Sequence, residues 1–273
     1  MILRLCCIAA VCVPLGCATD RAPPHASGKA ARTLARDGFA WRTEVAPGIH
    51  LHYLPGSYAA KHASEFALQA ADALAYDLTL AGLPEQNEPV ELFLVGSREE
   101  MMEITGWRYR GQAIPGELTA FFITEPATRP AFRHEIMHAL TLKVWGQQRS
   151  GSWLSEGVAT WAGGGCQGHT LDAIAAGFLR DGTLPQLDSL DARFWATDEL
   201  HGYFTAASAV GFLARTRGND SVRQLWERVM PAEMHPLGLE GAAIEDAWRR
   251  HLSTVPPARI DTVRLNVHGC QTP

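Results

Sequence analysis

The chain has 273 residues, and 47% of them are hydrophobic, which is enough apolar sequence to bury a sizeable core. Its formal net charge is -5, and only 19% of its residues are charged. Because no run of lysine or arginine occurs, the sequence lacks the basic surface that nucleic-acid binding requires. We therefore expect a globular protein with no nucleic-acid partner.

The first 16 residues have the pattern of an export signal. Arg4 precedes an apolar run from Leu5 to Leu15 that is too short to span a bilayer. The segment ends in LGC, which resembles a bacterial lipoprotein cleavage site with Cys17 as the lipidated first residue of the mature chain. An ordinary secretory signal, cut after GCA, is the alternative. Both interpretations predict an exported protein of the bacterial cell envelope or periplasm, and the first predicts membrane attachment through Cys17.

Cysteine usage agrees with export. Cys166 and Cys270 are the two cysteines that remain beyond the signal and the anchor. In an oxidising compartment, two such thiols predict a disulfide that ties the C-terminal tail to the middle of the chain. The sequence does not fix the distance between them, so whether they pair stays open. Cys166 and His169 in CQGH could instead be half of a metal site, but no second pair of suitable ligands accompanies them.

Residues 17–38 are predicted to be a flexible tether, because they are rich in proline, glycine and small residues and show no apolar period. Order is expected to begin near Phe39. From that point no repeat and no obvious linker divides the chain. We therefore expect residues 39–273 to form a single domain.

Strands dominate the predicted elements of the first half. Two short strands should flank a turn at Pro47 and Gly48, and apolar residues at helical spacing predict a helix from 58 to 81. PVELFLVG is predicted to be a buried strand, and SREEMMEITG a short helix with Ser97 as its N-cap. ELTAFFIT is predicted to be another strand. It is either an edge strand to which an extended peptide adds or an interior strand.

Past Pro130 nearly every segment has helical periodicity. This division predicts the α+β class, with the strand-rich half packed on the helix that follows Pro130. That helix contains RHEIMHAL, in which His134 and His138 lie one turn apart on a single face. Both imidazoles can therefore reach one metal ion, while Glu135 lies about 100° round the helix, beside the open position of that ion.

A catalytic zinc site takes three protein ligands and leaves a position for water. A third histidine in the metzincin arrangement would require glycine at 141 and histidine at 144, but the sequence has Thr141 and Val144. A second helix, predicted for SGSWLSEGVATWAGGG, offers Glu156 instead. A connection of a few residues after Gly146 would bring this helix back with Glu156 facing the two histidines.

HEIMH followed by WLSEGVA resembles the gluzincin peptidases, the group of thermolysin and aminopeptidase N. The resemblance implies a zincin-like fold, in which Zn²⁺ is held by His134, His138 and Glu156 and Glu135 is the general base. It covers residues 118–165. A weaker extension to residue 217, through YFTAASAVGFLARTRG, looks like the helix of small bacterial peptidases of this clan that carries a tyrosine near the metal.

Two features depart from that group. Four residues after its glutamate, thermolysin has an acidic residue that orients a ligand histidine, whereas this chain has Thr160. The glycine-rich, acidic segment by which aminopeptidases hold a free N-terminus has no counterpart before the zinc motif. The orientation of the histidines and the choice between endo- and exopeptidase activity therefore stay open.

The resemblance implies hydrolysis of peptide bonds, in which Glu135 takes a proton from zinc-activated water and passes it to the leaving amine. The oxyanion needs a further donor. Tyr203 is the candidate donor and His201 the alternative. In the other interpretation, Tyr203 is a half-buried aromatic residue that packs in a helix, and His201 is a surface or capping residue. His50 and His52 alternate along a strand and are predicted to be surface residues, because no acidic partner occurs at matching spacing.

Two hypotheses follow from these residues. In the first, residues 39–273 form a metallopeptidase-like catalytic domain that cuts peptide or protein substrates in extended form. In the second, the chain is an envelope lipoprotein that retains the peptidase fold but only binds a peptide or a partner. The complete set of two histidines, base and third ligand favours the first hypothesis. The natural substrate and the oligomeric state are not encoded in any recognisable pattern.

Overall fold

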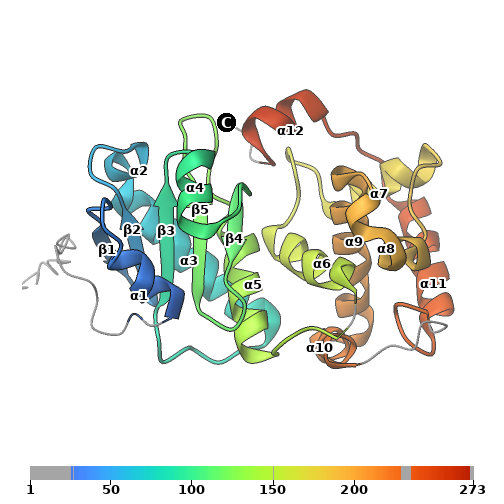
Figure 1. The fold of residues 1–273 in the computed structure, drawn as a ribbon. Helices are drawn as coiled ribbons and strands as arrows, with labels where there is room; N and C mark the ends of the chain where they lie inside the picture. The colour runs from blue at the N-terminus through green and yellow to red at the C-terminus, as the bar shows by residue number, and fades with distance from the viewer. Residues whose placement is uncertain (1–25, 27, 150, 229–234, 271–273) are drawn as a thin grey trace, which may run out of the picture.

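A computed structural model of the chain describes residues 26, 28–149, 151–228 and 235–270. The predicted export signal, residues 1–16, and the predicted lipid anchor at Cys17 lie outside the described residues. Figure 1 shows the strands gathered in one half of the molecule and α6 to α11 in the other, with α5 between them. The elements in chain order are α1 (Gly28–Leu34), β1 (Arg42–Ala46), β2 (Ile49–Tyr53), α2 (Tyr58–Lys61), α3 (Ala63–Ala81), β3 (Val90–Val95), α4 (Arg98–Thr105), β4 (Gly111–Ala113), β5 (Thr119–Ile123), α5 (Phe132–Val144), α6 (Ser152–Gly163), α7 (Leu171–Arg180), α8 (Leu187–Arg193), the 3₁₀ helix η1 (Phe194–Ala196), α9 (Glu199–Arg217), α10 (Asn219–Glu227), α11 (Gly241–Thr254) and α12 (Thr262–His268).

The strands form one mixed sheet in the order β1-β2-β3-β5-β4. β2, β3 and β5 run parallel, while β1 and β4 are antiparallel to their neighbours. The predicted strands on either side of Pro47 and Gly48 are confirmed as β1 and β2. The edge-strand interpretation of ELTAFFIT is wrong, because β5 lies between β3 and β4. The edge beside α5 is β4, which has only three residues and therefore no periodic signal in the sequence.

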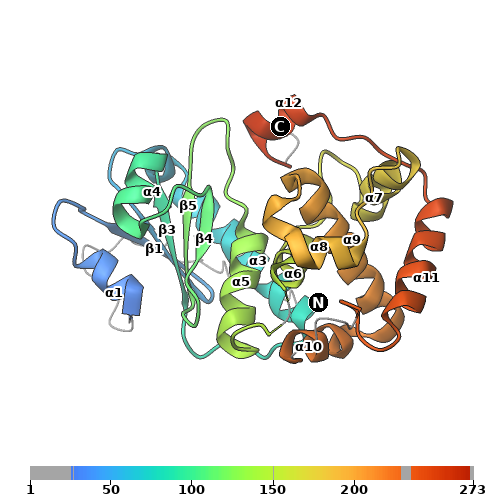
Figure 2. The ribbon, with the colours of Figure 1, turned by 45° about the vertical axis from the view of Figure 1, so that its right-hand side comes forward.

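Helices cover both faces of the sheet. On one face, α3 and α5 bury an apolar cluster that includes Leu92, Phe122 and Ile136. On the other face, α1 and α4 lie over a second cluster, which includes Phe93 and Phe121. Figure 2, turned by 45°, shows α1 and α4 on the side of the strands away from α5. The sheet therefore supports α5 along its buried side, as the division of the sequence into strands and helices predicts.

The predicted tether ends earlier than expected, because residues 28–34 form α1. This helix buries Ala30 and Thr33. The Lys29 ammonium donates to the carbonyl of Ile104 at 2.6 Å, and the Trp41 indole N–H donates to the carbonyl of Thr33 at 3.1 Å. These contacts with residues outside the helix hold α1 against the rest of the protein.

The surface assignment of His50 and His52 is also wrong. The acidic partner comes from the neighbouring strand β3, where Glu91 lies 3.0 Å from Nδ1 of His50 and 2.5 Å from Nε2 of His52. His52 is fully buried, and its Nδ1 lies 2.9 Å from the hydroxyl of Thr43. Burial lowers the pKa of His52 despite this carboxylate. Because Glu91 is far from both histidines in the sequence, strand spacing alone gives no sign of the pair.

In the second half, α6 and α9 pack against each other over much of their length (Figure 1). A Cβ atom at Gly157 would lie 3.1 Å from the Ala206 backbone, so glycine permits the close approach of these two helices. No strand follows β5 in the described part of the chain, which agrees with the predicted α+β class. Among the same residues, no helix is both long and apolar enough to cross a membrane.

The predicted disulfide between Cys166 and Cys270 is confirmed. It joins the loop after α6 to the residues after α12, and the amide of Gln167 donates to the carbonyl of Cys270 at 2.9 Å. The C-terminal segment is thereby held close to α6 (Figure 1).

Candidate metal centre

The first two candidate ligands lie on α5, whose opposite side is fixed against the sheet. Phe132, Ile136 and Leu140 recur at helical spacing and are buried under the strands. This packing turns His134 and His138 away from the sheet and toward α6. Their Nε2 atoms lie 3.2 Å apart, so both rings point at the same place.

The third candidate ligand lies on α6. The buried side chains of Trp153, Leu154 and Val158 fix this helix in the helical half. Glu156 therefore faces α5, and its Oε2 lies 3.4 Å from Nε2 of His134 and 3.3 Å from Nε2 of His138.

These separations fit a metal ion. In a tetrahedral zinc site, ligand atoms about 2.0 to 2.1 Å from the metal are about 3.3 to 3.4 Å from one another. The three pairs of ligand atoms of His134, His138 and Glu156 lie 3.2, 3.3 and 3.4 Å apart. In the described part of the chain, no other group of three such side chains brings its ligand atoms within 4.8 Å of one another. The three residues could therefore hold a metal ion.

The electrostatics keep the third ligand ionised. Burial alone would raise the pKa of the Glu156 carboxyl, but hydrogen bonds from His134 and His138 outweigh burial and hold this pKa far below its usual range. A carboxylate that is charged at neutral pH can bind a cation without first losing a proton. Tyr203 lies beside the same carboxylate. Burial and the negative charge of Glu156 raise the pKa of the Tyr203 hydroxyl, so this group stays protonated and can donate.

Glu135, the predicted base, does not point at the three ligand atoms. Its carboxyl group lies against the edge strand β4, where the Ala113 backbone contributes a hydrogen bond. Burial raises the pKa of Glu135 to about 7. Gly111 leaves the space that this carboxyl group occupies, because a Cβ atom at position 111 would overlap it.

The orientation of the histidines has an explanation that the sequence did not supply. The hydroxyl of Ser155, on α6 next to Glu156, lies 3.3 Å from Nδ1 of His138. This contact can fix the ring so that Nε2 faces the metal position. Thr160 lies four residues after Glu156, where thermolysin has an acidic residue. Its hydroxyl is buried and has no hydrogen-bond partner among the described residues.

Two cavities adjoin the cluster. One has a volume of about 460 Å³ and extends toward α3, and the other has a volume of about 560 Å³ and extends toward η1 and α9. Arg110, Gly111, His134 and Glu135 line both cavities. The cluster therefore lies at the junction of a cleft that continues on either side of it, and each half is large enough for part of a peptide.

The two candidate oxyanion donors lie in different surroundings. Tyr203 lines the larger cavity, and its ring stacks on that of His134 at a centroid distance of 6.2 Å. His201 lines neither cavity. Its Nδ1 lies 2.8 Å from Asp198 and its Nε2 lies 3.2 Å from Thr183, so both ring nitrogens are already engaged. The structure brings Tyr203 to the cluster and leaves His201 outside it.

Sequence reasoning missed two residues of this site. Gly111 belongs to a strand of three residues that gives no pattern, and its importance depends on its distance to Glu135. Ser155 precedes Glu156 within WLSEGVA, so its place one residue before a candidate ligand was the only available signal. No family model matches this chain, and no curated protein matches it either.

Proposed function

We propose that this chain is a zinc-dependent peptidase of the gluzincin type, in which Glu135 is the general base. The observation that carries the proposal is the agreement of three ligand separations, 3.2, 3.3 and 3.4 Å, with tetrahedral zinc. Two histidines and one carboxylate are also the ligand set of catalytic zinc in thermolysin-like enzymes. Glu135, which is buried and adjacent to the candidate ligand His134, is placed to act as a general base.

When bound, zinc supplies Lewis-acid chemistry, because it polarises the carbonyl of a peptide bond and lowers the pKa of water. The Glu135 carboxylate accepts the proton that the attacking water loses and delivers it to the nitrogen of the leaving amine. The Tyr203 hydroxyl donates a hydrogen bond to the oxygen on which negative charge develops. His134, His138 and Glu156 would hold the ion.

The edge strand supports an extended peptide as the substrate. β4 pairs with β5 on one side only, and Gly111 at its start lines both cavities. A peptide can add to such an edge by backbone hydrogen bonds, which places one of its bonds beside the cluster. We propose β4, in place of β5, as the strand that receives the substrate.

We also retain export as part of the proposal. The disulfide between Cys166 and Cys270 supports an oxidising compartment, in which such bonds persist. Cleavage after residue 16 with lipidation of Cys17 is tested by mass spectrometry of the protein from bacterial membranes. A chain that is cut later and carries no lipid would indicate an ordinary secretory signal.

Metal content and peptide hydrolysis test the function together. The purified protein should contain about one zinc per chain and cleave members of a peptide library. Glu156→Ala should lose most of the zinc, because two histidines alone hold it weakly. Glu135→Gln should keep the zinc while hydrolysis falls by at least about 10²-fold, the scale of a positioned base.

Two results would contradict the proposal. Unchanged zinc content in Glu156→Ala would remove that residue from the ligand set. A wild-type protein that binds zinc and peptides but cleaves none would support the alternative, an envelope protein that binds a peptide or partner without catalysis.

A further inference from the structure

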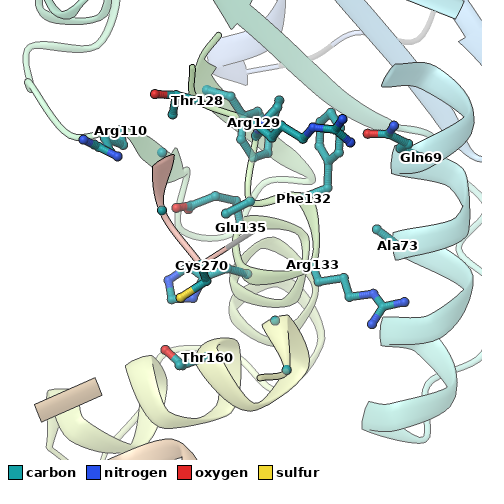
Figure 3. Close-up of a pocket in the computed structure, with 18 of the residues that line it drawn as sticks. Gln69, Ala73, Arg110, Thr128, Arg129, Phe132, Arg133, Glu135, Thr160 and Cys270 are labelled. Carbon is teal, nitrogen blue, oxygen red and sulfur yellow. The ribbon is translucent and has the colours of Figure 1, made fainter. Parts of the chain in front are cut away.

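The cavity of about 460 Å³ has an unusual charge for this protein. The chain as a whole has a net charge of -5, yet Arg110, Arg129 and Arg133 all line this cavity. Glu135 is the only acidic residue among the described residues that line it. In Figure 3 the Glu135 carboxyl lies on the side of Arg110, whereas Arg129 and Arg133 extend to the other side, toward α3.

The positive charge on the α3 side is not neutralised within the described protein. The Arg129 side chain forms no hydrogen bond or ion pair with any described residue. The Arg133 guanidinium lies 3.9 Å from the centroid of the Tyr76 ring, a contact that fixes its position without cancelling its charge. The neighbouring acid, Asp77, is buried, and burial raises its pKa to about 9, so it is uncharged at neutral pH.

The rest of this half of the cavity is apolar or uncharged. Phe132 on α5 and Ala73 on α3 line it, and Gln69, which is also on α3, extends from that helix in Figure 3. A carbon chain can pack on the ring and methyl group, while its charged end meets the guanidinium groups. Arg129 and Arg133 line the cavity while remaining exposed to solvent, so their guanidinium groups are accessible to a ligand. Guanidinium groups bind carboxylates with charge-assisted hydrogen bonds.

We propose that Arg129 and Arg133 form a subsite that binds a carboxylate of the substrate, so that the enzyme prefers peptides with an acidic group a few residues from the cleaved bond. The inference rests on the proposed peptidase function. In an unmodified peptide, a carboxylate comes either from an Asp or Glu side chain or from the C-terminus. Both sources present the same chemistry to the two arginines.

Matched peptide mixtures test the preference. Each mixture has seven residues, of which six are randomised among residues other than Asp and Glu and one is fixed as Glu or Gln, and each is made with a free or an amidated C-terminus. Glu and Gln have nearly the same shape, so a difference in the initial rate at low peptide concentration reports the charge. The wild-type protein with zinc should cleave the Glu mixture about 10-fold faster than the Gln mixture at one or two fixed positions.

Substitutions then assign the preference to the arginines. Arg129→Gln and Arg133→Gln should each reduce the ratio of Glu to Gln rates to about 3-fold or less, while the rate on the amidated Gln mixture stays within about 2-fold of wild type. Arg133→Lys should keep more of the ratio than Arg133→Gln, because it retains the charge. Arg250→Gln is the matched control, since Arg250 is an exposed arginine on α11 that lines neither cavity, and it should not change the ratio.

The outcomes separate this inference from the proposed function. A preference that follows the fixed Glu places the carboxylate on a side chain, and one that follows the free C-terminus places it at the end of the peptide. Equal rates for all charged and neutral pairs would overturn the subsite. If no mixture is cleaved, the peptidase proposal fails, and polarisation binding of fluorescein-labelled Glu and Gln mixtures decides the subsite. Tighter binding of the Glu mixture that Arg129→Gln abolishes would support it, and equal binding would refute it.

Discussion

The backbone of Gly111 on the edge strand lies so close to the carboxyl group of Glu135 that a Cβ atom at position 111 would overlap it. Glycine thus creates the space for the base beside the strand that we propose as the peptide-binding edge. The three candidate metal ligands come from α5 and α6, so a substitution at Gly111 on β4 replaces none of them.

Gly111→Ala should therefore impair catalysis without removing the metal. The added methyl group must displace the Glu135 side chain or the edge strand, and we expect hydrolysis to fall by about 10²-fold with zinc content unchanged. Gly96→Ala is a suitable control, because a Cβ atom there would meet only Glu100, at an ordinary distance of 3.5 Å. Full activity in Gly111→Ala would show that Glu135 does not act from the position seen here. Zinc content and peptide hydrolysis, measured on the same preparations, distinguish the two outcomes.

Ser155→Ala should weaken metal binding. Its hydroxyl lies 3.3 Å from Nδ1 of His138, and loss of a group that orients a ligand typically lowers metal affinity by about 10- to 100-fold. Ser152→Ala on the same helix is the control, because its hydroxyl contacts Trp195 instead of a ligand. Competition with a zinc-binding dye measures both affinities. An unchanged affinity in Ser155→Ala would mean that helix packing alone orients His138.

Tyr203→Phe should lower turnover and leave the Michaelis constant nearly unchanged. The hydroxyl forms a hydrogen bond with Glu156 in this structure. As a donor to the oxygen on which negative charge develops it acts mainly in the transition state, so we expect a loss of about 10- to 10³-fold in kcat, on the scale of single oxyanion donors. His201→Ala should keep normal kcat, because both ring nitrogens of His201 are engaged by Asp198 and Thr183. Steady-state kinetics on one cleaved peptide compares the two variants. The opposite pattern would transfer the donor role to His201.

The sequence predicted the parts of this site that depend on local spacing. The one-turn separation of two residues at i and i+4 is a property of any α-helix, and it allows the Nε2 atoms of His134 and His138 to lie 3.2 Å apart. The position of Glu156 was predictable because a short connection between two helices brings it back toward the histidines. Its placement opposite the histidines follows from the packing of α5 on α6.

Features that depend on contacts between distant segments were not predictable in this way. Glu91 approaches His52 only because β2 and β3 are neighbours in the sheet. Likewise, Gly111 matters because β4 lies beside α5. Nothing in the sequence near Arg129 or Arg133 indicates that these side chains line a cavity bounded by α3. Local periodicity determines which residues share a face of one element, but pairing and packing decide which faces meet.

Asp77 on α3 has two carboxyl oxygens that are buried without a hydrogen-bond partner among the described residues. Burial raises its pKa from 3.8 to about 9. In the unfolded chain this carboxyl loses its proton above about pH 4, whereas in the folded chain it keeps the proton up to about pH 9. The folded state therefore binds the extra proton, and this group lowers the free energy of unfolding as the pH rises from about 4 to about 9.

Asp77→Asn cannot ionise, so its free energy of unfolding should exceed that of the wild type by a margin that grows with pH. We expect almost no difference near pH 4 and a margin of several kcal/mol at pH 8, because stability changes by about 1.4 kcal/mol per pH unit between the two pKa values. Urea unfolding at pH 5, 6.5 and 8 measures the margin, and comparison at the same pH removes the contribution of every other titrating group. Asp72→Asn, an exposed aspartate on the same helix, should show no such trend. A constant margin across this range would mean that Asp77 ionises normally in the folded protein, and the charge of Arg133 would then be partly neutralised by its neighbour.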